Sequence, residues 1–192
     1  MKLILKNRKF AILITVVVAV LATMFGVSRT SGRQTRKIEA MFYDGVYLEG
    51  EGYTQPGMSS HIRNCADAAL GFATIMENHP ELAQEAGKLI ATQQALVDAY
   101  SLSNINSAFI SMVDSYNVLM SATTRIALSE REAAAVNQYS NLFSGAQKAM
   151  ESSRYNTMVT EYLDGRSALT LIISLLAPVK APHYFDMPTL DS

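Results

Sequence analysis

The sequence has no tryptophan and only one cysteine, Cys65, in 192 residues. Without a second cysteine, an intrachain disulfide and a cysteine zinc cluster are both excluded. A lone cysteine at apolar helical spacing is typical of a small core residue rather than of a nucleophile. The three histidines, His61, His79 and His183, are too scattered to put two metal ligands on one helical face. We therefore expect no metal site.

Motifs that bind phosphate or mark a nucleophile are also missing. The chain contains no GxGxxG, no GxxxxGKS or GxxxxGKT and no GxSxG sequence. We expect no cofactor and no enzymatic activity. An enzyme that uses carboxylates such as Asp67 and Glu77 is the weakest of the functional hypotheses.

Acidic residues are absent from the start of the chain, where eight of the 16 lysines and arginines lie at or before Lys37. The first acidic residue is Glu39, so the part from Ile38 onward holds eight basic and 17 acidic residues, a formal net charge of −9. Nucleic acid and anionic lipid headgroups would repel such a domain. We expect no nucleic-acid partner, and only the basic start suits the surface of a bilayer.

One long uncharged run dominates the N-terminal part, after the basic flank of residues 1–9. It covers eighteen residues, 10–27, and a helix of this length reaches about 27 Å, close to the ~30 Å hydrocarbon core of a bilayer. Arginines and lysines flank it on both sides, where they can extend to the headgroups. The run predicts a single transmembrane helix that faces lipid with Phe10, Ile14, Val18, Leu21 and Val27.

A cleaved signal peptide is the alternative interpretation, because Val20 and Ala22 could form a small-residue cleavage site. Signal peptides have a shorter apolar core of ~7–15 residues and are not followed directly by basic residues, so a retained anchor is favoured. Four basic residues lie on each side of the run, and the positive-inside rule barely decides the orientation. We favour a cytoplasmic N-terminus in the cell membrane, with the bulk of the chain outside.

The rest of the chain has the periodicity of helices. Residues 28–57 read as a juxtamembrane helix and a glycine- and proline-containing loop, and residues 58–192 as one domain. Alternating steps of four and three residues predict an all-α, antiparallel up-and-down bundle with four main helices, a short C-terminal helix and an extended tail. The strongest pattern excludes a strand and consists of Ile105, Phe109, Met112, Tyr116, Leu119, Thr123 and Ile126.

Helix ends follow from local signals. Pro80 suits the first turn of a helix that runs to Tyr100 and is capped by Asn78 or His79, although it could instead kink a longer helix. Ser129 and Glu132 form a capping box at the start of the last long helix.

The last long helix is expected to run to Tyr162, with Gly165 as its left-handed cap. The apolar residues 167–177 are too few to cross a bilayer and are predicted to pack on the bundle, with the membrane interface as the alternative. Prolines keep the remaining tail extended, and Tyr184 and Phe185 are the groups able to attach it to the bundle.

Tyr155, Val159 and Tyr162 share one helical face, and Asn156 lies beside it. Asparagine is a poor helix former that suits a backbone group left free at a helix end or loop. We predict that this patch clamps the returning tail through Tyr184, Phe185 and Asn156. A partner-binding patch is the alternative.

The C-terminal third resembles proteins of the LemA family. The segments that carry the resemblance are Tyr155-Asn-Thr-Met-Val-Thr-Glu-Tyr162, the apolar run after it, and Pro182-His-Tyr-Phe-Asp186. Leu163 stands where the family repeats asparagine, so the chain resembles a divergent branch of the family. The resemblance implies a helical bundle on a membrane anchor and supplies no reaction.

Two functional hypotheses from different classes remain. The first is a non-enzymatic, single-pass membrane protein of the LemA type that binds or scaffolds another cell-envelope protein in bacteria. The second is a membrane-tethered four-helix sensor that binds a small ligand between its helices and acts through a separate partner.

Overall fold

The structure, a computed structural model, describes residues 8–50, 52–166 and 181–188, with side chains from residue 11 onward. The chain divides into two compact units. The anchor unit comprises Met1–Glu39 and Val159–Pro182, and the bundle unit comprises Ala40–Met158 and His183–Ser192. Residues 40–57, assigned from sequence to the juxtamembrane segment, therefore belong with the bundle.

Helix α1 (Arg8–Asp44) is one continuous helix that includes the predicted transmembrane segment 10–27 and the first part of the juxtamembrane segment 28–57. Within the described residues it is the one helix long and apolar enough to cross a membrane, with a mean hydropathy of 2.5 in its most apolar part. It ends at Asp44, because Gly45 adopts a left-handed φ of 84° and its N–H bonds the Met41 carbonyl at 3.1 Å.

A short hairpin, β1 (Val46–Leu48) and β2 (Tyr53–Gln55), follows α1 in place of the predicted loop. The strands are antiparallel, with Val46 opposite Gln55. Three residues a strand are too few to produce a recognisable alternation of apolar and polar residues. The sequence analysis missed the hairpin for this reason.

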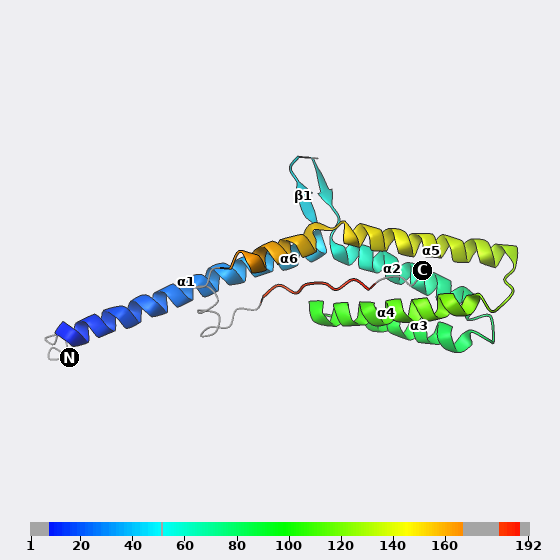
Figure 1. The fold of residues 1–192 in the computed structure, drawn as a ribbon, viewed down its shortest axis with the longest axis horizontal. Helices are drawn as coiled ribbons and strands as arrows, with labels where there is room; N and C mark the ends of the chain where they lie inside the picture. The colour runs from blue at the N-terminus through cyan, green and yellow to red at the C-terminus, as the bar shows by residue number, and fades with distance from the viewer. Residues whose placement is uncertain (1–7, 51, 167–180, 189–192) are drawn as a thin grey trace. The chain divides into compact units, whose positions relative to one another are not determined.

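The bundle consists of α2 (Met58–Met76), α3 (Ala83–Val97), α4 (Leu102–Thr123) and α5 (Glu130–Glu151). In Figure 1 these helices lie roughly parallel to one another, with short connections at their ends. Helix α2 packs against α5 and α3, and α3 packs against α4. The predicted all-α, antiparallel bundle with four main helices is confirmed.

Aromatic rings fill the centre of the bundle. Tyr116 and Phe143 stack with centroids 4.0 Å apart and an interplanar angle of 6°, and Phe72 meets Tyr116 edge-on at 5.3 Å. The strongest stripe of the sequence contributes to this core, since Phe109, Met112, Tyr116, Leu119 and Thr123 are all buried. Burial of large side chains along one face of each helix is the main stabilising contribution.

The start of α3 differs from the prediction. The helix begins at Ala83 behind a turn that contains Pro80, and the residue at the N-cap, Leu82, makes no side-chain cap. Asn78 instead donates from its side-chain amide to the Thr74 carbonyl at 3.3 Å, at the end of α2. The end was also placed too late, because α3 stops at Val97 and leaves Tyr100 92% exposed.

The last long helix is two helices. Its predicted capping box is confirmed at Ser129 and Glu132, but α5 ends at Glu151 and α6 runs over Arg154–Asp164. At the break, the Gln55 amide donates to the Ser152 carbonyl at 3.2 Å and accepts from the Arg154 N–H at 3.4 Å. The Gln55 side chain, from the hairpin, thus forms hydrogen bonds with backbone groups that the break between α5 and α6 leaves without helical partners.

Helix α6 ends without the predicted left-handed glycine. Among the described residues only Gly45 and Gly52 have positive φ, and the Gly165 N–H simply bonds the Glu161 carbonyl at 2.9 Å. The tail over residues 181–188 has no helix or strand, as expected for an extended segment. The helix predicted at 167–177 lies outside the described residues.

Cys65 occupies the core, as the sequence predicted, with its thiol 3.7 Å from the Phe143 carbonyl. Burial raises the pKa of the thiol from 9.0 to about 12. The folded state therefore favours the protonated thiol. The stability that the buried thiol contributes is complete below pH 9, and it is lost as the pH rises toward 12, where the buried thiol must ionise.

We expect the folded chain to resist alkylation of Cys65 by a fluorogenic maleimide at pH 7.5, because the thiolate is disfavoured and the thiol is inaccessible. Unfolding in urea should make the single thiol react at the rate of a free peptide thiol. The time course of fluorescence measures this, and equally rapid labelling with and without urea would contradict the burial of Cys65.

Candidate functional site

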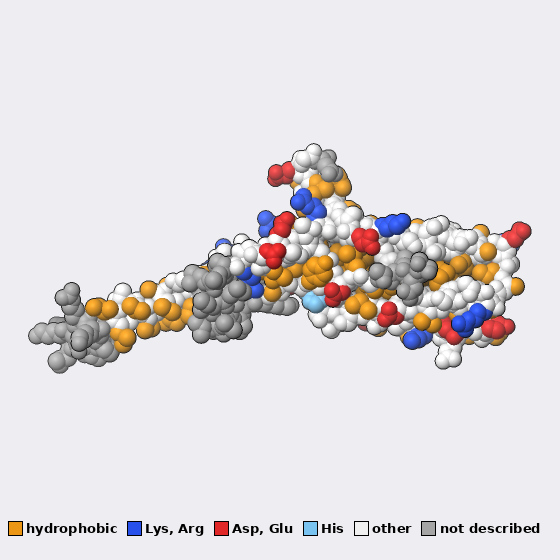
Figure 2. Space-filling model, in the orientation of Figure 1, with side chains coloured by type: hydrophobic (Ala, Val, Ile, Leu, Met, Phe, Trp, Pro, Cys, Tyr) orange, Lys and Arg blue, Asp and Glu red, His pale blue; other side chains and the backbone are white. Residues whose placement is uncertain are grey.

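The predicted lipid-facing side chains are exposed along α1. Ile14, Val18 and Leu21 are 44%, 58% and 58% exposed, and Val27 is half-buried. The backbone of Phe10 lies in α1, and its side chain is outside the described set. Figure 2 shows the hydrophobic side chains along this part of the helix. Such a continuous exposed apolar surface is unfavourable in water and favourable in lipid.

Asn156 binds the backbone of the tail with both ends of its side-chain amide. Its Nδ2 donates to the Phe185 carbonyl at 2.8 Å, and its Oδ1 accepts from the Phe185 N–H at 3.0 Å. The Asn156 side chain therefore pairs with the backbone of the extended tail as the backbone of a neighbouring β-strand would. The sequence analysis predicted this contact of Asn156 with the tail backbone.

The ring of Phe185 enters the bundle beside the amide of Asn156. It is 1% exposed and lies 5.7 Å, between centroids, from both Phe42 and Phe109. The Tyr155 hydroxyl donates to the His183 carbonyl at 2.6 Å and its ring meets Phe42 edge-on at 5.3 Å. Buried apolar area and these three hydrogen bonds thus hold residues 183–185 of the tail.

Two polar residues of the bundle that the sequence analysis did not select also hold the tail. The Asn106 amide donates to the Asp186 carboxylate at 3.3 Å, and the Gln147 amide donates to the Pro188 carbonyl at 2.9 Å. Both side chains are buried. A polar residue on the apolar face of a helix was the feature of the sequence that could have indicated them. We call the groove formed by Asn106, Phe109, Gln147, Tyr155 and Asn156 the tail groove; Figure 1 shows the tail passing along α4.

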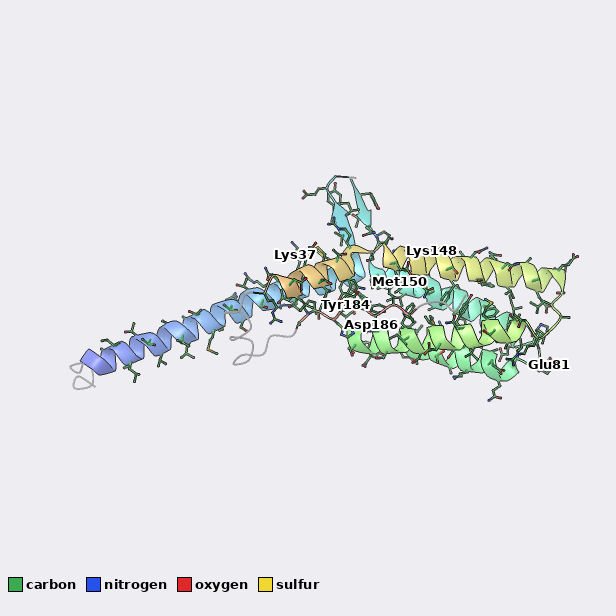
Figure 3. All side chains as sticks on the ribbon, in the orientation of Figure 1. Lys37, Glu81, Lys148, Met150, Tyr184 and Asp186 are labelled. Carbon is green, nitrogen blue, oxygen red and sulfur yellow. The ribbon has the colours of Figure 1, made fainter. Side chains whose placement is uncertain are left out.

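Other members of the predicted patch behave differently. Tyr184, expected to pack on the tyrosines, is 47% exposed, and Figure 3 labels it with Asp186 on the tail. In the extended backbone, alternate side chains point to opposite sides, so burial of Phe185 directs Tyr184 outward. Val159 is buried and Tyr162 is half-buried, both within the anchor unit.

We expect Asn156→Ala to lower the free energy of unfolding by about 1–3 kcal/mol, because the Phe185 N–H and carbonyl would lose their partners in a buried place. Maleimide labelling of Cys65 during urea unfolding of the full-length chain in detergent measures this. Asn137→Ala, the same substitution at an exposed site of α5, should change the midpoint little. Equal effects of the two substitutions would contradict the clamp.

An apolar groove lies between α2, α3 and the start of α4 in the bundle unit. It encloses about 250 Å³ and has Tyr43, Ile62, Leu96, Val97 and Ile105 among its lining residues. Arg63 and Asp67 are exposed at its edge, four residues apart on α2. We call it the α2–α3 groove, and it combines an apolar floor with charges of both signs.

A larger cleft lies between α2 and α5. It measures about 560 Å³ and is lined by His61, Asn64, Asp67, Tyr139 and Asn141, with apolar residues between them. Partial burial lowers the pKa of the His61 imidazole, which favours its neutral form. The cleft offers hydrogen-bond donors and acceptors to a small polar ligand.

His79, in the turn after α2, and Glu132, in the first turn of α5, form a hydrogen bond with 3.1 Å between Nε2 and Oε1. Hydrogen bonds from the Ser129 hydroxyl and N–H lower the pKa of the Glu132 carboxyl. Both side chains stabilise the start of α5. Within residues 8–50, 52–166 and 181–188, no three His, Cys, Asp or Glu side chains are grouped as a metal site would require.

Comparison with known proteins adds no relative: no family model, curated protein sequence or solved structure matches the chain.

Proposed function

We propose that the protein is a non-enzymatic, single-pass membrane protein of the bacterial cell envelope whose helical bundle binds or scaffolds another envelope protein. The observation that carries the proposal is the exposed apolar surface of α1, from Ile12 at 56% to Phe25 at 69% exposure. A bilayer is the environment in which that surface is stable. The bundle is then held at the membrane, with the N-terminus in the cytoplasm.

The α2–α3 groove supports a protein partner. Val97 at its edge is 60% exposed, and Tyr100 nearby in sequence is 92% exposed. Aromatic and aliphatic side chains around an apolar depression are typical of the centre of a protein interface, and flanking charges such as Arg63 and Asp67 set its orientation. The occupant we propose is an apolar segment of an envelope protein.

Assignment to the LemA type is part of the proposal. Its support is that the two motif segments that resemble the family meet through Asn156 and Phe185. The two segments, residues 155–162 and 182–186, occur together for a structural reason, since the tail binds only when both are present.

In-cell photo-crosslinking tests the partner. A photoreactive amino acid at Val97 should capture the same envelope protein as one at Tyr43, and Val97→Glu should abolish capture from position 43. Val118 is the matched control, because it is 50% exposed on α4 and lines none of the grooves described above. Absence of an enriched protein at both groove positions, or equal capture at position 118, would contradict the proposed function.

A ligand-binding sensor is the second candidate, favoured by the His61, Asn64 and Asn141 side chains that line the cleft between α2 and α5. Its signal would pass to a separate protein. A melting-temperature screen with small polar metabolites tests it: stabilisation that His61→Ala removes would favour the sensor, and no stabilisation by any compound would favour the scaffold.

A further inference from the structure

Where the apolar run of α1 ends, the anchor unit contains a pocket of about 440 Å³. Its walls come from α1 and from the end of α6, and Thr30, Ser31, Gln34, Glu161, Tyr162 and Arg166 are among the lining residues. This volume is within the range of small-molecule sites. All these residues belong to one unit of the chain.

Hydrogen bonds hold the two walls of this pocket together. The Tyr162 hydroxyl pairs with the Ser31 hydroxyl and accepts from Thr35 at 3.3 Å, and both α1 partners are buried. Tyr162 therefore has a defined position, and its aromatic ring is available as a surface on which a cation can lie.

Arg166 occupies that surface with its guanidinium carbon 5.9 Å from the centre of the Tyr162 ring. Its Nε is buried, and no residue within 8–50, 52–166 or 181–188 forms a hydrogen bond with it. An unpaired charged donor in a buried place costs free energy. An anionic group in the pocket would remove that cost and would gain the charge-assisted hydrogen bonds for which guanidinium is suited.

The lining has a second charge of opposite sign. Glu161 lies at the pocket, and no ion pair joins it to Arg166 among the described residues. A purely anionic ligand would meet this carboxylate unfavourably. A ligand with both a phosphate and an ammonium group would place the phosphate at Arg166 and the ammonium at Glu161, with the hydroxyls of Thr30 and Ser31 as further donors.

The position along α1 agrees with such a ligand. Ser31 lies four residues beyond Val27, about 6 Å along the helix axis. The headgroup layer begins at the end of the hydrocarbon core and is about 5–8 Å thick on each side of a bilayer. Tyrosine is enriched at this depth in membrane proteins, and Tyr162 fits that preference.

We propose that this pocket binds the headgroup of a zwitterionic phospholipid that carries a primary ammonium, as phosphatidylethanolamine does. The inference rests on the membrane anchor of the proposed function. It differs from general attraction of anionic lipid by the exposed Arg29, Arg33, Arg36 and Lys37, which needs no pocket and no carboxylate.

Native mass spectrometry of the full-length chain tests the site. The detergent-purified protein is delipidated and given equal amounts of phosphatidylethanolamine, phosphatidylcholine and phosphatidylglycerol. We expect one retained phosphatidylethanolamine per chain, and weaker retention of the choline lipid, whose methylated ammonium cannot donate to Glu161. Arg166→Ala and Glu161→Gln should each lower retention about tenfold.

The controls remove the same charges outside the pocket: Arg33→Ala on α1 and Asp164→Asn on α6, both exposed and neither lining it. Gly26→Phe should block the lipid without loss of a charge, because a Cβ at Gly26 meets no atom within 4 Å and a larger side chain has room. Cys65 labelling in urea verifies that each variant folds.

Equal retention of the three lipids, or equal losses in Arg166→Ala and Arg33→Ala, would overturn the inference. Free phosphoethanolamine that displaces the lipid completely at micromolar concentration would show a soluble ligand and would also overturn it. Flotation with vesicles tests the anchor separately: a chain that floats but retains no lipid contradicts only the headgroup site, and a chain that does not float contradicts the proposed function.

Discussion

Replacing Phe185 by alanine should lower the free energy of unfolding by about 3–5 kcal/mol, a large part of the ~5–15 kcal/mol of an ordinary domain. The ring is 1% exposed and touches Phe42 and Phe109, so its removal leaves a cavity that both neighbours line. The contact also holds the tail in the tail groove, so its loss should release residues 183–188 before the bundle unfolds. Urea unfolding followed by Cys65 labelling measures the change in the free energy of unfolding.

Hydrogen exchange of the tail amides measures the release of residues 183–188 that Phe185→Ala should cause. The matched control is Tyr184→Ala, which removes a neighbouring aromatic side chain that is 47% exposed and should shift the midpoint little. The double variant with Asn156→Ala should cost less than the sum of the single variants, because both remove the same attachment. Full additivity would show that Asn156 and Phe185 act independently and that the tail groove is not one unit.

Phe143→Ala should have an effect of similar size, about 3–5 kcal/mol, but in the centre of the bundle. Phe143 stacks on Tyr116, and its loss opens a cavity between α4 and α5 that the helices cannot close without moving. Far-ultraviolet circular dichroism in urea measures the change without depending on the thiol, which lies beside Phe143.

Leu142→Ala is the control for Phe143, since the adjacent side chain is 53% exposed. Its urea midpoint should remain close to that of the parent chain. A larger loss from Leu142→Ala than from Phe143→Ala would mean that the register of α5 is shifted by one residue, which moves a helical side chain by about 100° around the axis.

Prediction from the sequence was accurate where a local pattern carries the information. The spacing of Phe109, Met112, Tyr116 and Leu119 encodes one buried face of α4, because side chains three and four residues apart lie on the same side of a helix. The capping box at Ser129 similarly involves residues only three apart. The uncharged run of residues 10–27 indicates the apolar surface of α1 directly.

Sites that join distant parts of the chain were predicted in part. Asn156 was selected because it is a poor helix former in a patch of tyrosines, and its bonds to Phe185 cross 29 residues. Asn106 and Gln147 were not selected, because nothing near them in the sequence indicates that Asp186 and Pro188 lie beside them. The interruption between α5 and α6 was missed for the same reason, since the Gln55 side chain that bonds across it is 97 residues away.

The sequence by itself therefore determined the four bundle helices, the order in which they occur and the apolar run of α1, because these depend on residues within one or two turns of each other. Tertiary structure decided which polar side chains meet the tail, which of Tyr184 and Phe185 is buried, and that Arg166 lies over Tyr162 at a pocket of about 440 Å³. These contacts depend on packing between elements, and no local periodicity encodes the distance between residues that the fold brings together.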